Sequence, residues 1–351
     1  MDLSQWKSEA LLASTFRDDY TLEHAKLENL YSKSKRHQWN AELDVDWDRF
    51  EPDVDVLDRK ADLLSRLSCV QELPEDQQAR LFKAANIFLM SQVLHGEQAA
   101  LMTCGQLVNA VPHMDGKFYA STQTLDEARH VEVFAAYIKK LDEVQEIAPA
   151  LKLLLDDVLA TEDWKKKAVG MQVVTEGLAL YSFRDMRNQT KEPLLKQLLT
   201  NVTRDEARHT GYGIKYLNAI VPTLDDAEKA GIEDYAFEAA RRLVDSRGGT
   251  SMRESVFKIW EEAGIDPMEG FAEVMKERDK IMAAIQAQGG RRGPIRGFVV
   301  PTLRSIGLFS ERIEGHFDEM FEANVGALAG KIADDPRDLP EDLEAWALGE
   351  A

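Results

Sequence analysis

One pentapeptide occurs twice in this chain, and its spacing from two other glutamates restricts the folds that the chain can adopt. Residues 126–130 read Asp-Glu-Ala-Arg-His, and residues 205–209 repeat the same letters. Glu97 lies thirty positions before the glutamate of the first copy, and Glu176 lies thirty positions before the glutamate of the second. The chain therefore contains one unit, Glu followed later by Glu-x-x-His, in two copies at a constant offset.

The repeated unit falls in a region of long helical patterns. A helix over 75–111 is expected, because Pro74 and two acids begin it and Pro112 ends it. Further helices are expected over 115–142, 148–160, 162–190 and 193–220. Long helices with short joints, each with an apolar face, predict an antiparallel four-helix bundle. Strand patterns are almost absent, so the predicted fold class is all-α.

The segments on either side of the bundle are also mostly helical in pattern. Before it, helices are expected over 4–15, 21–35 and 58–68, and an irregular segment over 38–47 is expected to cross the bundle and bury Trp39 and Trp47. After it, helices are expected over 224–245, 251–264, 267–287 and 310–332, with a basic, glycine-rich connector over 289–297. That connector lacks the spacing of any phosphate-binding motif.

This pattern divides the chain into four parts. An N-terminal extension covers 1–73, the bundle core covers 74–222, further C-terminal helices cover 223–333, and an acidic tail covers 334–351. The tail contains Trp346 and is expected either to be disordered or to dock on a partner.

Charge and composition exclude several classes of protein. The formal net charge of −19 argues against a nucleic-acid partner, because phosphates would be repelled. No basic leader precedes an apolar run, and no run of uncharged apolar residues is long enough to span a membrane. Cys69 and Cys104 lie in apolar helical surroundings, which favours buried free thiols. We therefore expect a cytoplasmic protein without a membrane span.

The repeated unit is the candidate for chemistry. Glutamate and histidine three residues apart lie one turn apart on a helix face, so both can reach one metal ion. One copy alone is typical of a solvated face, but two copies with equally spaced upstream glutamates favour a metal site. The predicted metal ligands and catalytic residues are Glu97, Glu127, His130, Glu176, Glu206 and His209. Two divalent cations would balance the four carboxylates, and oxygen-rich ligation suits iron or manganese better than structural zinc.

Asp126 and Asp205 precede the ligand glutamates of the two copies. Metal-bound imidazoles usually donate their second N–H to a carboxylate or carbonyl. The symmetry of the repeat favours cross-pairing, Asp126 with His209 and Asp205 with His130. The alternative is that both aspartates are surface acids.

Over roughly residues 75–220 the chain resembles the ferritin-like di-iron carboxylate superfamily. Gly96-Glu97-Gln98-Ala99-Ala100 and residues 126–130 are similar to the hydroxylase of bacterial multicomponent monooxygenases, with ribonucleotide reductase small subunits as related proteins. The resemblance implies a ferritin-like bundle with additional N- and C-terminal helices. It also implies two iron ions per chain (or manganese with iron), O2 as co-substrate, an external electron donor such as a ferredoxin or flavin reductase, and a homodimer.

Four positions differ from named relatives. Leu180 stands where monooxygenase hydroxylases carry a threonine, and Phe134 stands where most reductase subunits carry a radical tyrosine. Met171 stands where ligand-binding oxidases carry a crosslinking tyrosine. Arylamine N-oxygenases carry an extra ligand histidine one turn before the last motif, where Val202 and its neighbours offer none.

The resulting hypothesis is a non-haem di-iron oxygenase or oxidase that oxidises a small apolar organic substrate. The alternatives are a radical-generating subunit of ribonucleotide reductase and an iron-oxidising ferritin-like protein. Candidate pocket residues, each of which is otherwise core, are Gln123, Phe134, Gln172, Leu180, Phe183, Val202, Thr203 and Gly213. Tyr119, Tyr137, Tyr181 and Tyr212 are either redox-active phenols or packing residues.

Overall fold

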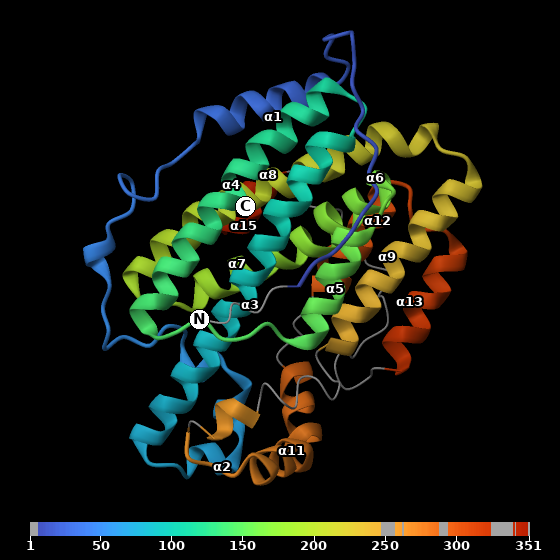
Figure 1. The fold of residues 1–351 in the computed structure, drawn as a ribbon. Coiled ribbons are helices and arrows are strands. Elements are labelled where there is room, and N and C mark those ends of the chain that lie inside the picture. The colour runs from blue at the N-terminus through green and yellow to red at the C-terminus, as the bar shows by residue number, and fades with distance from the viewer. Residues whose placement is uncertain are drawn as a thin grey trace.

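The computed structural model describes residues 6–246, 257–261, 263–287, 294–323, 340 and 342–349. Within these residues every regular element is helical and none is a strand, so the all-α prediction is confirmed. The bundle consists of α3 (Glu75–Ala110), α4 (Met114–Leu141), α7 (Glu176–Gln189) and α8 (Pro193–Ile220), as Figure 1 shows. None of the helices described here is long and apolar enough to cross a membrane.

Prolines and acids set the ends of the bundle helices. Pro74 is the N-cap of α3, and Glu75 and Asp76 lie in its first turn, where negative charge is favoured by the helix dipole. At the start of α8, the Glu192 carboxylate accepts hydrogen bonds of 3.1 and 2.7 Å from two first-turn amides. Pro193 occupies the first helical position, where its missing N–H costs nothing. These local signals explain why the predicted bundle helices end within a residue or two of the observed ones.

The connection between α4 and α7 contains two further helices, α5 (Pro149–Ala160) and α6 (Trp164–Ala168). Helix α5 packs on α3, with Leu155 and Leu159 against Ala99. The chain thus returns along the bundle before α6 begins, and α4 and α7 run in the same direction, each antiparallel to α3 and α8. The sequence predicted short connections and an antiparallel bundle. Both predictions are wrong for α4 and α7, because α5 lengthens the connection between them.

A π-helical segment, Val169–Thr175, joins α6 to α7 without a break. A π-turn inserts an extra residue into the helix and changes the direction of the side chains that follow it, here that of Glu176. A Cβ atom on Gly213 of α8 would lie 2.3 Å from the Cβ of Gln172 in this segment. The glycine therefore permits the close approach of α8 to the π-helical segment.

The expected N-terminal helix over 4–15 is wrong for the residues described, because residues 6–24 contain no helix. The backbone of this segment bonds to the bundle instead: the Thr15 amide donates to the Asn109 carbonyl (3.0 Å), and the Thr15 hydroxyl donates to the Ala110 carbonyl (2.9 Å). Helix α1 (Ala25–Arg36) follows, shifted from the expected 21–35, and lies on α4 and α8.

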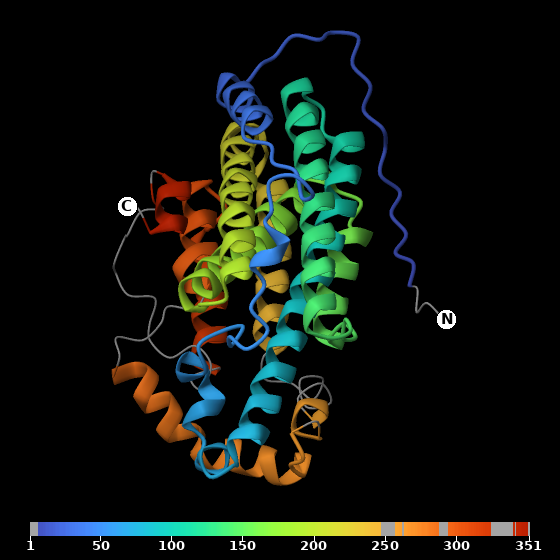
Figure 2. The same cartoon turned by 90° about the vertical axis from the view of Figure 1, so that its left-hand side faces the viewer.

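The segment over 38–47 is irregular, as expected, and crosses the outside of the bundle, where Figure 2 shows it in blue. Trp39 and Trp47 are partly buried against the apolar cluster that contains Phe134. The expected helix over 58–68 is wrong. The Asp58 and Asp62 carboxylates each cap a separate 3-10 turn there, and helix α2 (Ser68–Gln71) comes afterwards.

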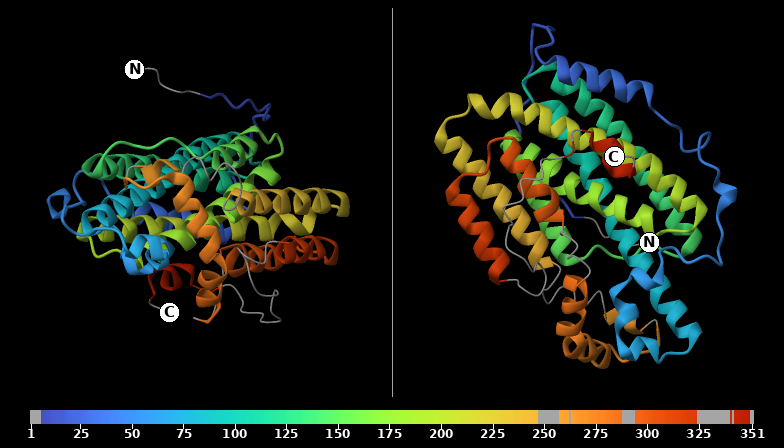
Figure 3. Two further views of the ribbon diagram at one scale, coloured as in Figure 1. Left: turned by 90° about the horizontal axis from the view of Figure 1, so that it is seen from below. Right: turned by 180° about the vertical axis from the view of Figure 1, so that it is seen from behind.

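The C-terminal helices lie outside the four-helix bundle (Figure 1 and Figure 3). They are α9 (Asp226–Ser246), α11 (Pro267–Ala287), α12 (Val300–Ser305), α13 (Glu311–Ala323) and α15 (Leu343–Leu348). Helix α9 packs on α5 and α13, α11 contacts α2, and α15 packs on α8 and α7 (Figure 3). The acidic tail thus ends in a helix that docks on its own chain.

Three C-terminal expectations reach beyond the described residues. Of the expected helix over 251–264, residues 257–261 are helical, and 251–256 and 262 lie outside the description. The expected connector over 289–297 is wrong for 294–297, because a π-helical segment, Ile295–Val299, leads into α12. Helix α13 covers the first part of the expected helix over 310–332, and residues 324–332 lie outside the description.

Two apolar clusters divide the bundle along its axis. On α3 one cluster contains Leu94 and the other contains Leu107, and on α8 they contain Val202 and Tyr212 respectively. On both helices the predicted ligands fall between the two clusters. The polar residues of the repeat therefore occupy a layer that is closed by apolar side chains above and below.

Candidate metal centre

All six predicted ligands lie in this layer and are buried. Glu97 comes from α3, Glu127 and His130 from α4, Glu176 from the first position of α7, and Glu206 and His209 from α8. Glu97 is the most exposed of them, at 4%. The side chains converge on one point because each helix presents its motif face to the bundle axis.

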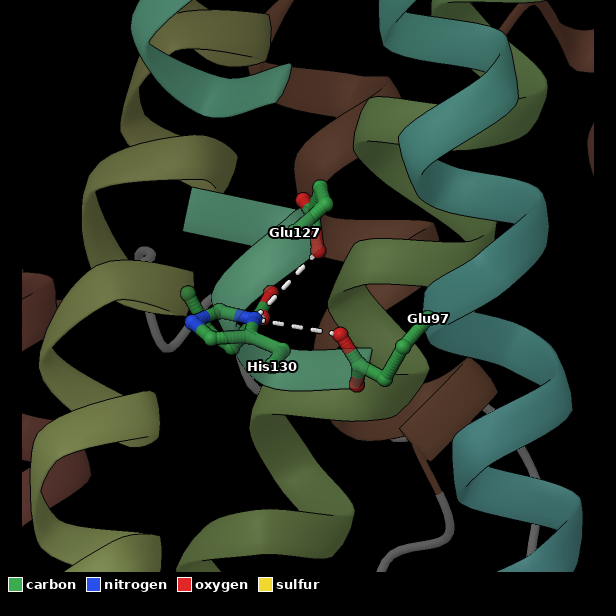
Figure 4. A group of neighbouring side chains, drawn as sticks. Glu97, Glu127 and His130 are labelled. Carbon is green, nitrogen blue, oxygen red and sulfur yellow. Dashed lines mark hydrogen bonds and ion pairs between the residues drawn. The ribbon is translucent and has the colours of Figure 1, made fainter. Parts of the chain in front are cut away.

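On the side that faces the other ligands, the His130 imidazole contacts carboxylates from three residues. Its Nδ1 atom lies 3.1 Å from Glu97 Oε2, 3.3 Å from Glu127 Oε2 and 3.1 Å from Glu206 Oε1. Figure 4 shows the first two of these contacts, one to Glu97 of α3 and one to Glu127 of α4 itself. On the other side, His209 Nδ1 lies 3.0 Å from Glu127 Oε1 and 3.5 Å from Glu206 Oε2.

These contacts define two overlapping groups of ligand atoms. Glu97, Glu127, His130 and Glu206 form one group, and Glu127, Glu176, Glu206 and His209 form the other. Within each group one atom per residue lies within 4.8 Å of the rest. Glu127 and Glu206 belong to both groups, so they stand where carboxylates would bridge two metal ions.

The donor atoms fit a pair of cations. Glu127 Oε2, both carboxylate oxygens of Glu206 and Nδ1 of His209 are buried, and despite the short contacts given above they form no hydrogen bond of acceptable geometry among the described residues. A buried carboxylate without a donor is costly, and a metal ion removes that cost. Four carboxylates and two neutral imidazoles carry the charge that two divalent ions balance.

The pKa shifts of the ligand carboxyls also favour a pair of bound cations. Burial, followed by repulsion from Glu206, raises the pKa of Glu176 well above its usual value, and burial also raises the pKa of Glu97. Burial opposes ionisation of Glu127 too, yet the two nearby imidazoles hold its pKa well below the usual value. Divalent cations would favour the ionised form of all four carboxyls.

The aspartates of the repeat lie behind the histidines in the expected crossed arrangement. The Nε2 atom of His130 is 3.1 Å from Asp205 Oδ2, and that of His209 is 3.2 Å from Asp126 Oδ2. A carboxylate partner at Nε2 fixes the N–H there and leaves Nδ1 free to face the ligand cluster. Arg129 lies between the two aspartates and donates to both, over 2.6 and 2.9 Å.

Two residues of this layer were not predicted from the sequence. The Trp39 indole donates to Asp205 over 2.7 Å, and the Gln38 amide donates to Asp126 over 2.7 Å. Both belong to the irregular segment that crosses the bundle. The sequence shows that these two adjacent residues have side-chain N–H donors. It does not show which acidic residues they contact.

Gln123, predicted as a pocket residue, instead bonds directly to the ligands. Its amide nitrogen donates to Glu176 Oε1 over 2.8 Å and to Glu127 Oε1 over 3.1 Å. The Gln172 amide donates to the Gln123 carbonyl over 2.9 Å. The signal was present in the sequence, because Gln123 lies one turn before Glu127 on the same helix face.

The remaining predicted pocket residues are buried around the cluster. Phe134 and Phe183 stack with ring centroids 5.6 Å apart, next to Val202 in the same apolar cluster. Leu180 belongs to a separate cluster with Ala207 of α8, Phe298 of the π-helical segment Ile295–Val299, and residues of α15. Of the four tyrosines considered, Tyr181 lies apart, only partly buried, with its ring 6.4 Å from that of Trp346.

Comparison with solved structures gives partial likenesses. A protein from Synechococcus with aldehyde deformylating oxidase activity is 16% identical, over 67% of this chain and 97% of its own, with a TM-score of 0.46. An R2-like ligand-binding oxidase from Sulfolobus acidocaldarius is 17% identical, over 72% of this chain and 94% of its own, with a TM-score of 0.44. No protein with a curated description matches the chain.

Comparison with protein families gives a match over most of the chain. The family described as P-aminobenzoate N-oxygenase AurF matches residues 21–288, a range that contains every predicted ligand. The resemblance to ferritin-like di-iron proteins is thereby confirmed, although Val202 stands where the additional ligand histidine of arylamine N-oxygenases was expected from the sequence. This protein belongs to the P-aminobenzoate N-oxygenase AurF family of ferritin-like, non-haem di-iron oxidoreductases.

Proposed function

We propose that the six residues Glu97, Glu127, His130, Glu176, Glu206 and His209 hold two iron ions, with Glu127 and Glu206 shared between them. The observation that carries this proposal is the pair of overlapping ligand groups, whose shared carboxylates have buried oxygens without hydrogen-bond donors. Manganese in place of one iron suits the same oxygen-rich donors. Two ions of this kind, when bound and reduced, supply the electrons that activate dioxygen.

The substrate we propose is a small, largely apolar organic molecule, with an aromatic amine as the first candidate. The family description names an N-oxygenase of an aromatic amine. In this chain, Phe134, Phe183 and Val202 offer a buried apolar wall beside the ligand layer. The Thr203 hydroxyl is buried without a hydrogen-bond partner among the described residues, so it is free to bond a polar substituent.

The residues around the ligands position them and exclude water. Asp126 and Asp205 hold the two imidazoles in one tautomer, and Arg129 offsets the charge of both aspartates. Gln123 ties Glu127 to Glu176 across two helices. A dry, rigid layer of this kind favours transfer of oxygen to the substrate over release of reactive oxygen species.

Further parts of the proposal concern the electron donor, the oligomeric state and the cellular location. Each oxidation consumes electrons that we propose come from an external ferredoxin or flavin reductase. We also propose a homodimer and a cytoplasmic location, where both cysteines would stay in the free form that the structure shows. The reductase alternative gains no support: Phe134 remains at the place of the radical tyrosine, and the helix with Trp346 docks on its own chain.

The test is oxygen consumption by iron-loaded protein, supplied with a reductant, with and without a panel of anilines and aliphatic amines. We expect substrate-dependent oxygen uptake, with oxidised nitrogen in the product identified by mass spectrometry. Glu127→Ala and His209→Ala should bind fewer than two irons per chain and lose the uptake. His95→Gln is the matched control, because within the described part of the chain the His95 ring bonds the Gln145 carbonyl, at 2.9 Å, and no ligand. Two irons per chain in Glu127→Ala would contradict the assignment.

A further inference from the structure

A row of stacked aromatic rings leads from the ligand layer toward one end of the bundle. Tyr212 lies three residues after His209 on α8, about 4.5 Å further along the helix axis. The Tyr212 and Tyr216 rings stack with centroids 5.6 Å apart, and Tyr216 stacks on Trp164 of α6, also at 5.6 Å. Tyr119 of α4 stacks on Tyr212 at 4.5 Å. The three tyrosines are buried, whereas Trp164 is partly exposed.

This row is specific to the second copy of the repeat. The residue seven positions after the histidine is a tyrosine in both copies, Tyr137 in the first and Tyr216 in the second. The residue three positions after the histidine is Val133 in the first copy and Tyr212 in the second. Aliphatic side chains are not readily oxidised by one electron, whereas phenols and indoles are. The Trp39 indole approaches the His130 side through its hydrogen bond to Asp205, but among the described residues the stacked series of oxidisable rings starts beside His209.

A base stands next to the central tyrosine of the row. The Tyr216 hydroxyl lies 3.0 Å from His113 Nδ1, and His113 Nε2 lies 3.8 Å from Glu23 Oε2. Burial, together with the His24 imidazole, lowers the pKa of His113, so its ring is neutral near pH 7 and Nδ1 can accept a proton. A buried phenol gives up an electron readily only if its proton can leave at the same time, and His113 provides the place.

We propose that Tyr212, Tyr216 and Trp164 form a one-electron relay that removes an oxidising equivalent from the metal centre when no substrate has consumed it. The inference rests on the proposed oxygen-activating function, which supplies the oxidant. One electron passes from Tyr216 through Tyr212 to the metal centre, and the Tyr216 hydroxyl proton moves to His113 Nδ1. Trp164 then returns an electron to Tyr216, which recovers its proton from His113. A small-molecule thiol at the surface reduces the Trp164 radical cation, so the thiol loses the one electron that the metal centre gains.

The first experiment follows the radical during turnover without substrate. Reduced, iron-loaded protein is mixed with oxygen, frozen within milliseconds and examined by electron paramagnetic resonance. We expect a tyrosyl signal that is reduced several-fold in Tyr216→Phe and unchanged in Tyr137→Phe. Tyr137 is the matched control, since it is equally buried, lies at the same position of the other copy and donates to the Glu192 carboxylate over 3.0 Å. An undiminished signal in Tyr216→Phe would overturn the relay.

The second experiment does not depend on oxygen chemistry. In protein loaded with zinc, which has no redox chemistry, a ruthenium photo-oxidant with a sacrificial quencher oxidises Trp164 from solution. We expect transient tyrosyl absorption in the parent protein, its loss in Tyr216→Phe, and slower formation in His113→Gln, which lacks a comparable base. If Tyr216→Phe does not fold, Trp164→Phe is used in its place and should lose the signal as well. Equal tyrosyl yields in these variants overturn the relay, whereas a failure of oxygen uptake alone bears only on the proposed function.

Discussion

At Asp205 a single buried carboxylate accepts hydrogen bonds from four side chains. The donors are His130, Trp39, Arg129 and Arg208. Burial opposes the charge on Asp205, but bonding to His130 and the two nearby guanidinium groups still lowers its pKa below the usual value. The carboxylate therefore stays ionised and holds the His130 ring with Nδ1 toward the other ligands.

Replacing Asp205 by Asn should weaken iron binding without removing a ligand. The amide is neutral, and it no longer stabilises the imidazole that donates to it, so we expect iron(II) affinity to fall by about 10- to 100-fold. Competition with a chromogenic chelator measures this affinity. Asp115→Asn serves as the control, because Asp115 is equally buried and also bonds an imidazole, that of His24, at 2.9 Å, outside the ligand layer. An unchanged affinity in Asp205→Asn would show that the aspartate has no influence on the ligand.

The residues that could be predicted are those whose spacing carries the information. Glu-x-x-His places two side chains on one helix face, and a constant offset relates the two copies. The six candidate ligands could therefore be identified from the sequence alone. That they bind metal stays a prediction. Trp39 and Gln38 could not be predicted as partners of Asp205 and Asp126, because an irregular segment has no periodicity that shows which helix its side chains contact. Gln123 was placed near the site, but its two bonds to ligands depend on the side-chain positions of another helix.

Among the elements, the bundle helices were predictable because strong local signals mark their ends. Pro74, Pro112 and Pro193 mark helix ends in the sequence, and the packed helices begin or end next to them in the structure. The first segment was not predictable, since hydrogen bonds from Thr15 to the end of α3 override a helical pattern. The π-helical segment was not predictable either, because it depends on how closely α8 can approach.

Substitutions at two glycines of α8 test how closely this helix must pack against the π-helical segment. In Gly213→Ala the new methyl would meet Gln172 at 2.3 Å, so the π-helical segment must shift, and we expect unfolding free energy to fall by about 1–3 kcal/mol. In Gly211→Ala the new methyl meets only the end of the Lys215 side chain, at 3.4 Å, and we expect no loss or a gain of up to about 1 kcal/mol. Urea denaturation measures both values. Equal stability of the two variants would mean that the π-helical segment can shift without a loss of unfolding free energy.

Lys167 gives α5 a buried positive C-terminal cap. Its ammonium donates to the carbonyls of Val158 (2.6 Å) and Leu159 (2.8 Å) at the end of that helix. Burial lowers the pKa of Lys167 to about 8. Between this pH and the usual lysine value, the unfolded chain therefore binds a proton that the folded protein does not.

This difference predicts a pH dependence. The contribution of Lys167 to stability should be full above the unfolded-state pKa, about 10.4, and should be lost as the pH falls through about 8. Compared with Lys167→Met, the parent protein should therefore gain unfolding free energy steadily between pH 8 and 10. Denaturation curves of both proteins across this range isolate the lysine, since all other groups titrate in both. A constant difference would show that the ammonium stays charged in the folded state.

At the scale of the whole molecule, one polar layer connects four helices that come from distant parts of the sequence. Apolar clusters close the layer on both sides, so its carboxylates are shielded from bulk water. Without cations, their mutual repulsion opposes assembly of the bundle. With cations, the same carboxylates tie α3, α4, α7 and α8 together. Metal binding and stability of the bundle should therefore be coupled.

The coupling should depend on whether a ligand is shared. Iron(II) binds only the assembled bundle, so a concentration one hundred times the dissociation constant should add about 2.7 kcal/mol per site. Glu206 belongs to both ligand groups and Glu97 to one, so Glu206→Ala should lose nearly all of the stabilisation and Glu97→Ala only part of it. In the presence of a chelator, Glu97→Ala should melt at or above the temperature of the parent protein, because burial and repulsion from Glu206 raise the pKa of the carboxyl that this variant removes. Anaerobic thermal melts with iron(II) or chelator measure these differences. Equal losses of stabilisation in the two variants would mean that Glu206 is not shared between two ions.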